Sequence, residues 1–277
     1  MPEGPEVKLV VDKLSKKLIN KTLIKIVVHN GKYTRFTDQF NNIFNLLPLK
    51  ISNIDCKGKF IYFEFYANDI VIFNTLGMSG YWFSSSETKS LPDVGVYSKK
   101  HNNVEFVFSN GSSYYFNDMR NFGNIIISNQ QDLINKLNKL GVDILNPKNE
   151  FNKFYDLITK KSNLTKQISL VLLDQTIVAG CGNYIRAEVL YLCKINPFIT
   201  IKNLSNTDFK NLYNYLKKVA YISYDIELGI KYSILKVNDK LIKMYENRVF
   251  LIYMQEIGPY GEEIKTKKMG DRTIYYV

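Results

Sequence analysis

Three residues at the start of the chain could together perform covalent chemistry on a sugar carbon or an aldehyde. Initiator methionine is normally removed before a small residue, and this would leave Pro2 with a free secondary amine. An α-amino group has a reference pKa of about 7.7–8.0, so part of it is neutral at physiological pH and can form a Schiff base. Glu3 and Glu6 follow, and carboxylates there could move protons or support a helix N-terminus. Taken alone, these residues also fit a chain start without chemistry.

The charge balance favours a polyanionic partner. Lysine and arginine number 37 against 26 acidic residues, a net charge of +11, and cations that neutralise phosphates release counterions. Adaptation for solubility would explain the same excess. With 45% hydrophobic and 23% charged residues, the chain is typical of globular proteins and not of disordered ones.

Other classes of protein are disfavoured. The three cysteines, Cys56, Cys181 and Cys193, form no paired zinc motif and are too few for a disulfide scaffold. No apolar run is long enough to span a membrane, and no signal peptide is recognisable. We therefore expect a soluble intracellular protein with no membrane partner, no cofactor and no metal.

The first half of the chain is typical of an α+β sandwich. A helix is predicted over about 6–19, with apolar residues at helical spacing. Short runs of β-branched and aromatic residues predict strands, and Asn68-Asp69 and Asn110-Gly111 predict hairpin turns. The predicted strands are 24–28, 60–65, 70–73, 104–108 and 113–116.

The second half is predicted to be mainly helical. Helices are expected over 132–140, 151–159, 168–173, 184–192 and 207–228, with strands returning at 248–254 and 273–277. We expect a sandwich domain over 1–130, a linker over 131–150, a helical domain over 151–246 and a terminal hairpin over 247–277. Asn183, after Gly180-Cys181-Gly182, is a plausible N-cap.

Five motifs in order resemble the formamidopyrimidine-DNA glycosylase/endonuclease VIII family and together cover nearly the whole chain. They are Met1-Pro2-Glu3-Gly4-Pro5-Glu6-Val7, Lys57-Gly58-Lys59, Leu76-Gly77-Met78-Ser79-Gly80, Asn117-Asp118-Met119-Arg120-Asn121-Phe122-Gly123 and the run from Leu172 to Glu188. The resemblance implies a helix-flanked β-sandwich, then a helical domain with a helix–two-turn–helix element.

The resemblance also implies roles for individual residues. Pro2 would be the nucleophile and Glu3 its acid/base partner. Lys59 would bind a phosphate near the lesion and assist the reaction. The residues that fill the void left when a nucleotide is flipped out of the duplex would be Met78, Arg120 and Phe122. Plainer interpretations stay open: Lys59 as a solvated hairpin cation, and Met78 as core packing.

Two phosphate contacts follow from the same resemblance. Asn183 and neighbouring amides would bind a phosphate at a helix N-terminus, although Asn183 could be an N-cap alone. Arg272 would clamp a phosphate from the terminal hairpin, or be an ordinary turn arginine. Many family members hold this hairpin with four cysteines and zinc, but residues 249–277 contain no cysteine or histidine. The chain thus resembles the branch with a zinc-less finger, known in vertebrates and giant viruses.

At two positions the sequence differs from the family pattern, so the resemblance implies less about the details of DNA binding there. Thr75 replaces the family's histidine, and Asn121 replaces the second arginine of Arg-Arg-Phe-Gly. Between residues 229 and 248 the sequence contains little that resembles the long glycine-rich loop of the guanine-directed branch. Lys231 and Tyr232 lie in the corresponding segment and could contact the lesion.

The resemblance implies a bifunctional glycosylase and abasic-site lyase that excises oxidised pyrimidines and hydantoins from duplex DNA. Its partner would be double-stranded DNA with oxidised or abasic sites, with single-stranded DNA as a further candidate, bound by a monomer. Two alternatives stay open. One is an 8-oxoguanine- or formamidopyrimidine-directed enzyme of the same family. The other is a non-enzymatic nucleic-acid-binding protein, because the helix–two-turn–helix element also occurs without catalysis.

Overall fold

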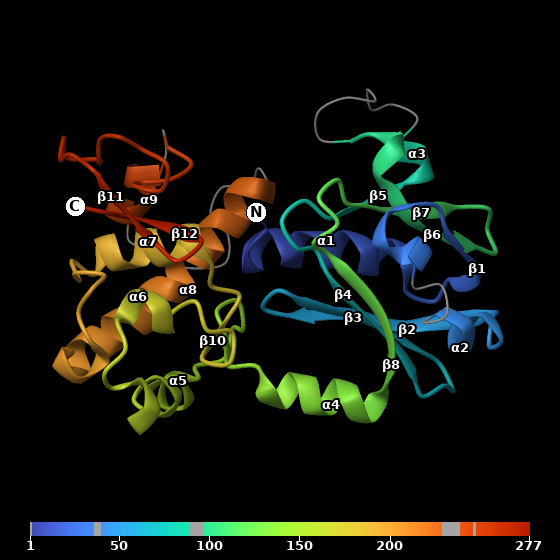
Figure 1. Cartoon of the computed structure of the whole chain (residues 1–277), viewed down its shortest axis with the longest axis horizontal. Helices are drawn as coiled ribbons and strands as arrows, with labels where there is room; N and C mark the ends of the chain where they lie inside the picture. The colour runs from blue at the N-terminus through green and yellow to red at the C-terminus, as the bar shows by residue number, and fades with distance from the viewer. Residues whose placement is uncertain (1, 36–39, 89–96, 229–238, 246–247) are drawn as a thin grey trace. The chain divides into compact units, whose positions relative to one another are not determined.

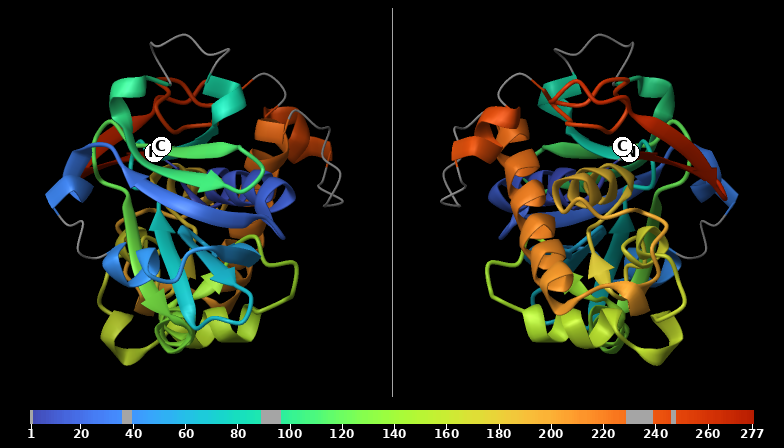
Figure 2. Two further views of the ribbon diagram at one scale, coloured as in Figure 1. Left: turned by 90° about the vertical axis from the view of Figure 1, so that its right-hand side faces the viewer. Right: turned by 90° about the vertical axis from the view of Figure 1, so that its left-hand side faces the viewer.

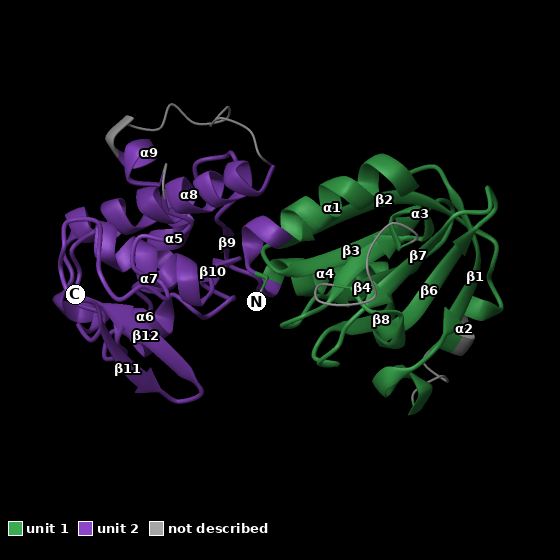
Figure 3. Ribbon diagram, turned by 90° about the horizontal axis from the view of Figure 1, so that it is seen from above, with its two compact units in different colours: residues 1–2, 7–138 green, residues 3–6, 139–277 purple. Residues whose placement is uncertain are grey.

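The computed structural model describes residues 2–35, 40–88, 97–228, 239–245 and 248–277. The chain divides into two compact units, drawn in different colours in Figure 3. The first comprises residues 1–2 and 7–138, and the second comprises residues 3–6 and 139–277. The division at 138/139 falls within the segment 131–150 that the sequence suggested as a linker.

The first unit is a β-sandwich built from one eight-stranded antiparallel sheet that folds into two layers (Figures 1 and 2). The strand order is β5-β7-β6-β1-β2-β3-β4-β8, and the layers join where β1 meets β2 in a short register. The strands are β1 Thr22–Val28, β2 Leu49–Lys57, β3 Phe60–Phe65, β4 Ile70–Thr75, β5 Tyr81–Ser84, β6 Asn102–Phe108, β7 Ser113–Asn117 and β8 Asn124–Asn129.

The sandwich core combines both layers with the apolar face of helix α1 (Gly4–Leu18). Val7, Val10, Val11, Leu14 and Leu18 recur at helical spacing and are all buried. Each such side chain contributes about 1.5–3 kcal/mol when fully buried. The amphipathic pattern of the sequence is therefore the reason that this helix packs where it does.

Short helices complete the first unit, and helix α4 ends it. The short elements are η1 Gly31–Arg35, α2 Asn41–Phe44, α3 Ser85–Thr88 and η3 Lys99–His101, and α4 covers Gln130–Lys139. After α4, β9 (Val142–Asp143) pairs in parallel with β10 (Val178–Ala179), so this part of the expected linker is packed into the second unit.

The second unit is a helical domain, coloured yellow to red in Figure 1. Its apolar core is formed mainly by the long helix α8 and by α5, α6 and α7. The elements are α5 Phe151–Ile158, η4 Lys161–Asn163, α6 Ile168–Val171, α7 Asn183–Leu192, η5 Ile201–Asn203, α8 Asn206–Leu228 and α9 Asp239–Tyr245. The short α6, the turns after it and α7 form the helix–two-turn–helix element.

A two-stranded antiparallel hairpin, β11 (Lys265–Met269) and β12 (Arg272–Tyr276), ends the described chain. The predicted strand at 248–254 is wrong, because the backbone N–H groups of Leu251, Ile252 and Tyr253 donate to the carboxylate of Glu188 and not to a neighbouring strand. Glu188 is fully buried and also accepts from the Tyr245 hydroxyl at 2.8 Å. A single carboxylate on α7 thus fixes the segment that leads to the hairpin.

Candidate functional site

Glu3, next to Pro2, is held by the N-terminus of helix α7. Its two carboxylate oxygens accept the backbone N–H groups of Tyr184 at 2.9 Å and Ile185 at 3.3 Å. The first N–H groups of a helix have no partner within the helix, and the helix dipole favours a negative charge there. Glu3 is 1% exposed, so its carboxylate occupies one defined position beside the half-buried Pro2.

Close backbone contact allows this arrangement. The Gly4 N–H donates to the Gly180 carbonyl oxygen at 2.9 Å, and a Cβ on Gly4 would lie 3.2 Å from the Gly180 Cα. Gly180 has φ 98°, a conformation that L side chains rarely adopt. The conformation of Gly180 therefore favours glycine, and the absence of a side chain at Gly4 lets the start of the chain approach this turn closely.

Glu6 has a structural role in the same network. It accepts the backbone N–H of Glu3 at 2.7 Å, three residues earlier, which is the carboxylate half of a capping box for α1. Its other oxygen accepts the Tyr184 hydroxyl at 2.9 Å. Burial, followed by the nearby Glu6 and Glu3 carboxylates, raises the pKa of Tyr184 well above its usual value. Tyr184 therefore stays protonated and donates to Glu6 throughout the physiological range.

Lys59 lies in the tight turn between β2 and β3. Gly58 has φ 58° at the first turn position, and Lys57 pairs with Phe60 across the turn. The Lys57 ammonium donates to the Leu137 carbonyl oxygen at 2.8 Å, so Lys57 is used to pack the turn against α4. Lys59 is half-buried and belongs to the same unit as Pro2.

The loops that carry Met78, Arg120 and Phe122 are joined through one buried carboxylate. Asp118, 0% exposed, accepts the Ser79 hydroxyl at 2.6 Å and the Gly123 N–H at 2.7 Å. The Ser79 hydroxyl oxygen in turn accepts the Arg120 backbone N–H at 3.1 Å. Asp118 and Ser79 thus hold the two loops in one arrangement.

The loop side chains themselves project from the core. Met78 is 37% exposed and Phe122 is 52% exposed, and the Arg120 guanidinium lies 4.9 Å from the centre of the Phe122 ring. Asn121 has φ 55°, and asparagine tolerates this left-handed region better than arginine does. The departure from the family's Arg-Arg-Phe-Gly therefore suits the local backbone.

Asn183 connects helix α7 to the hairpin. Its side-chain amide donates to the Thr273 carbonyl oxygen at 2.9 Å, next to Arg272 on β12. The expected N-cap role of Asn183 is wrong: the cap residue is Gly182, and the helix begins at Asn183 with the side chain engaged by the hairpin. Asn183 is 7% exposed.

Arg186 is the site residue that the sequence did not single out. It is 1% exposed, and its guanidinium donates to the Asn183 side-chain oxygen and, at 3.2 Å, to the Ser169 carbonyl oxygen. Burial lowers the pKa of Arg186, with Arg272 contributing in the same direction. An arginine three residues after Asn183 within an apolar helix was the available signal, because residues at that spacing share a helix face.

Lys231 and Tyr232 lie outside the described residues. Across the described part of the chain, no cluster of three or more histidine, cysteine or acidic side chains could hold a metal ion. Within the same residues, no helix has the length and apolar character needed to cross a membrane.

Solved structures with this fold include glycosylases bound to DNA. The Lactococcus lactis Fpg in complex with abasic-site DNA has a TM-score of 0.76 and 23% identity, covering 99% of this chain and 97% of that chain. MutM in complex with DNA containing carbocyclic 8-oxo-G has a TM-score of 0.76 and 24% identity, with the same coverage. The chain therefore shares its fold with these two DNA-bound proteins.

The family follows from sequence comparison. Residues 1–125 match the formamidopyrimidine-DNA glycosylase N-terminal domain, and residues 140–232 match the formamidopyrimidine-DNA glycosylase H2TH domain. The formamidopyrimidine-DNA glycosylase of Ligilactobacillus salivarius is 34% identical, over 79% of this chain and 76% of the relative. The formamidopyrimidine-DNA glycosylase of Mycoplasma mobile is 29% identical, over 100% of this chain and 97% of the relative. The chain belongs to the formamidopyrimidine-DNA glycosylase family, a family of DNA glycosylases of base excision repair.

Proposed function

We propose that this chain excises oxidised bases from DNA and then cuts the abasic strand, with the amine of Pro2 as nucleophile once Met1 is removed. The observation that carries the proposal is the fixed Glu3 carboxylate. It is buried, held by two backbone N–H groups of α7 and joined directly to Pro2. A general acid or base must lie within reach of its proton, and the Glu3 carboxylate is fixed one residue along the chain from the amine.

The chemistry proceeds in two stages. The neutral amine attacks C1′ of the everted nucleotide, the bond from C1′ to the base breaks, and the base leaves with a proton. The C1′–O4′ bond then breaks, O4′ takes up the proton that the amine nitrogen has lost, and the nitrogen and C1′ are joined as an iminium Schiff base. Loss of a proton from C2′ expels the 3′ phosphate, and a second elimination expels the 5′ phosphate. Glu3 is the group that moves protons in these steps, and Lys59 contributes positive charge beside the phosphates.

Phosphate contacts and void filling complete the proposal. Asn183 on α7 and Arg272 on the hairpin bind phosphates beside the everted nucleotide. We assign the hairpin to the zinc-less-finger branch of the family. Arg120 pairs with the orphaned base while Met78 and Phe122 wedge the stack. The exposure of these three side chains and the fixed geometry of their loops support this role.

We further propose oxidised pyrimidines and hydantoins as the main lesions, because the chain has little of the glycine-rich segment between 229 and 248 that the guanine-directed branch carries. The rival lesions are 8-oxoguanine and formamidopyrimidines, which the names of the relatives favour. Duplex DNA is the proposed partner of a monomeric enzyme.

A cleavage panel tests this function. Single-turnover reactions with duplexes containing thymine glycol, a hydantoin, 8-oxoguanine or an abasic site should give strand cleavage, fastest for the first two base lesions. Faster excision of 8-oxoguanine would assign the chain to the guanine-directed class. Binding without cleavage of any duplex would make it a non-enzymatic DNA-binding protein.

Arg120→Ala should slow lesion excision by about 10- to 100-fold, the equivalent of one charge-assisted hydrogen bond. Cleavage of a preformed abasic site should fall much less, because no paired base has to be displaced there. The measurement compares single-turnover rates on thymine-glycol and abasic duplexes. Equal losses on both substrates would mean that Arg120 only contacts the DNA backbone.

Arg272→Ala should lower excision by about 10- to 100-fold with little change in the melting temperature, because the side chain lies on a hairpin outside the helical core. Arg272→Lys should restore little, since lysine lacks the bidentate fork of arginine. Thermal melts and single-turnover excision check both variants. Parental rates in both would remove Arg272 from the phosphate site.

A further inference from the structure

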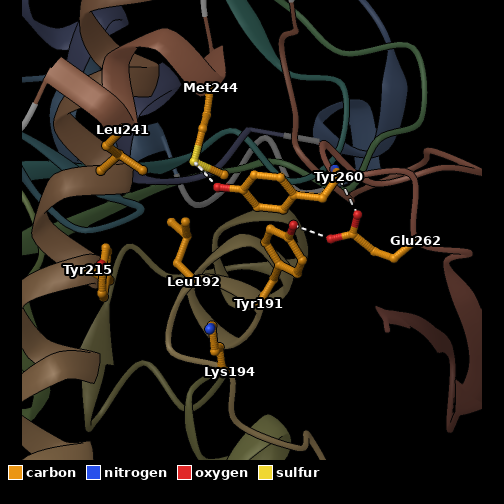
Figure 4. A pocket seen from close by; sticks show the side chains of 8 residues that line it. All are labelled: Tyr191, Leu192, Lys194, Tyr215, Leu241, Met244, Tyr260 and Glu262. Atoms are coloured by element: carbon orange, nitrogen blue, oxygen red, sulfur yellow. Dashed lines mark hydrogen bonds between the residues drawn. The ribbon is translucent and has the colours of Figure 1, made fainter.

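Two cavities lie at the C-terminal end of helix α7 and share two residues, Tyr191 and Lys194. The first, of about 450 Å³, lies between α7, α8, α9 and the turn that carries Tyr260 and Glu262 (Figure 4). The second, of about 510 Å³, lies between the end of α7 and the hairpin β11–β12. Each is large enough for a small organic ligand. Both lie within the second unit, and because they share two lining residues we refer to them together as the two-lobed site.

The backbone is strained at Lys194, one of the two residues that line both lobes. The N–H of Lys194 donates to the Tyr191 carbonyl oxygen at 2.9 Å, and that of Ile195 donates to the Leu190 carbonyl oxygen at 3.0 Å. These bonds form a Schellman motif, whose left-handed position normally holds glycine. Here it holds lysine at φ 55°. Strain of this kind is often kept where the side chain has a function.

The first lobe combines aromatic rings with a hydrogen-bond acceptor. Tyr191 and Tyr260 converge on Glu262: the Tyr191 hydroxyl donates to its carboxylate, and the Tyr260 backbone N–H donates to it at 2.8 Å (Figure 4). Tyr260 is 68% exposed and its hydroxyl contacts the Met244 sulfur at 3.7 Å. Flat aromatic surface beside a carboxylate suits a nucleobase, whose ring stacks and whose amino groups donate.

The second lobe is basic. Lys194 and Lys265 line it together with Tyr275 and Tyr276. Exposed Lys267, two residues further along strand β11, lies on the same face of the strand as Lys265 and adds positive charge to that face. Ammonium groups and aromatic rings in this combination are typical of surfaces that bind single-stranded nucleic acid.

We propose that the two-lobed site binds a nucleotide unit, with the base between Tyr191 and Tyr260 and the phosphate at Lys194 and Lys265. The separation of charge favours a nucleotide over an acidic peptide, because Glu262 would repel a carboxylate in the first lobe but accepts from a base. The site goes beyond the proposed catalytic function. Glu3 and Asn183 lie at the N-terminal end of the ten-residue α7, whereas these lobes lie at its C-terminal end, about 15 Å away along the helix.

The test measures fluorescence anisotropy of a labelled deoxycytidylate tetranucleotide with the full chain. A saturating unlabelled duplex that contains a tetrahydrofuran abasic analogue occupies the catalytic DNA site. The parent should bind the tetranucleotide, and Lys194→Gln, Lys194→Gly and Tyr260→Ala should each weaken binding about fivefold or more. Lys194→Gly relieves the strained backbone and should melt about 2–4 °C higher, so its loss of binding cannot come from lost folding.

Tyr66→Ala is the matched control, because Tyr66 is 50% exposed and lies on the other unit. Its binding should equal that of the parent.

Competition by unlabelled dCMP identifies the source of the ligand: displacement by dCMP at similar affinity indicates a free nucleotide, and much tighter binding of the tetranucleotide indicates a strand. Parental binding in all three site variants, or equal competition by hexaglutamate, would overturn the proposal. Failure of catalysis alone would leave this binding unchanged.

Discussion

Replacing Glu3 with glutamine should lower base excision by about 10²–10⁴-fold, the usual contribution of a positioned general acid or base. Glutamine is similar in shape and keeps one oxygen to accept from α7, where the carboxylate now receives the N–H groups of Tyr184 and Ile185. The loss of one acceptor should therefore reduce stability by only about 1–2 kcal/mol. Single-turnover excision of a thymine-glycol duplex and a thermal melt measure the two effects separately.

Glu6→Gln is the matched control for this variant. Glu6 belongs to the same network, since it accepts the Glu3 N–H and the Tyr184 hydroxyl, but it is four residues from the proposed nucleophile. Its excision rate should fall less than about tenfold, the equivalent of one ordinary hydrogen bond. Equal losses in both variants would mean that Glu3 only caps the helix.

Replacing Arg186 with methionine should slow excision by up to about a hundredfold, because a shift of about 1 Å in a positioning element has that cost. Methionine approximately fills the volume but leaves the Asn183 side-chain oxygen and the Ser169 carbonyl oxygen without this donor. Stability should fall by about 1–3 kcal/mol. We expect the effect to act through Asn183, whose amide holds the hairpin at Thr273.

A double-mutant cycle tests that route. If Arg186 acts by positioning the hairpin, Arg186→Met should add little to the loss already caused by Arg272→Ala. Additive losses in the double variant would mean that Arg186 acts independently of Arg272.

Strong chelators should leave the excision rates of parent and variants unchanged, as the proposed zinc-less finger requires.

Local sequence patterns predicted the longer helices and five of the eight strands of the sandwich. The period of apolar residues from Val7 to Leu18 predicted α1, although the helix begins at Gly4 and not near Glu6, because Glu6 occupies the third helical position and caps the Glu3 N–H. Asn110-Gly111 predicted the turn between β6 and β7, where Gly111 has φ 79°. Such signals depend on neighbours in the chain, so a sequence contains them directly.

Contacts between distant residues could not be predicted in the same way. Residues 248–254 have strand-like composition, yet their N–H groups bind Glu188, about sixty residues earlier in the chain. The same holds for Glu3, whose partners at 184 and 185 come from another element. The family resemblance identified Glu3 and Asn183, but only the packing reveals that Asp118 joins two loops and that Arg186 supports Asn183.

The central claim is that the Pro2 amine forms a covalent bond with the sugar of the damaged nucleotide. The most direct measurement adds borohydride during reaction with an abasic-site duplex, digests the trapped complex and identifies the modified peptide by mass spectrometry. We expect one DNA-derived adduct on an N-terminal peptide that lacks Met1 and begins with Pro2. Trapping on a lysine such as Lys59, or full activity of a protein that retains Met1, would contradict it.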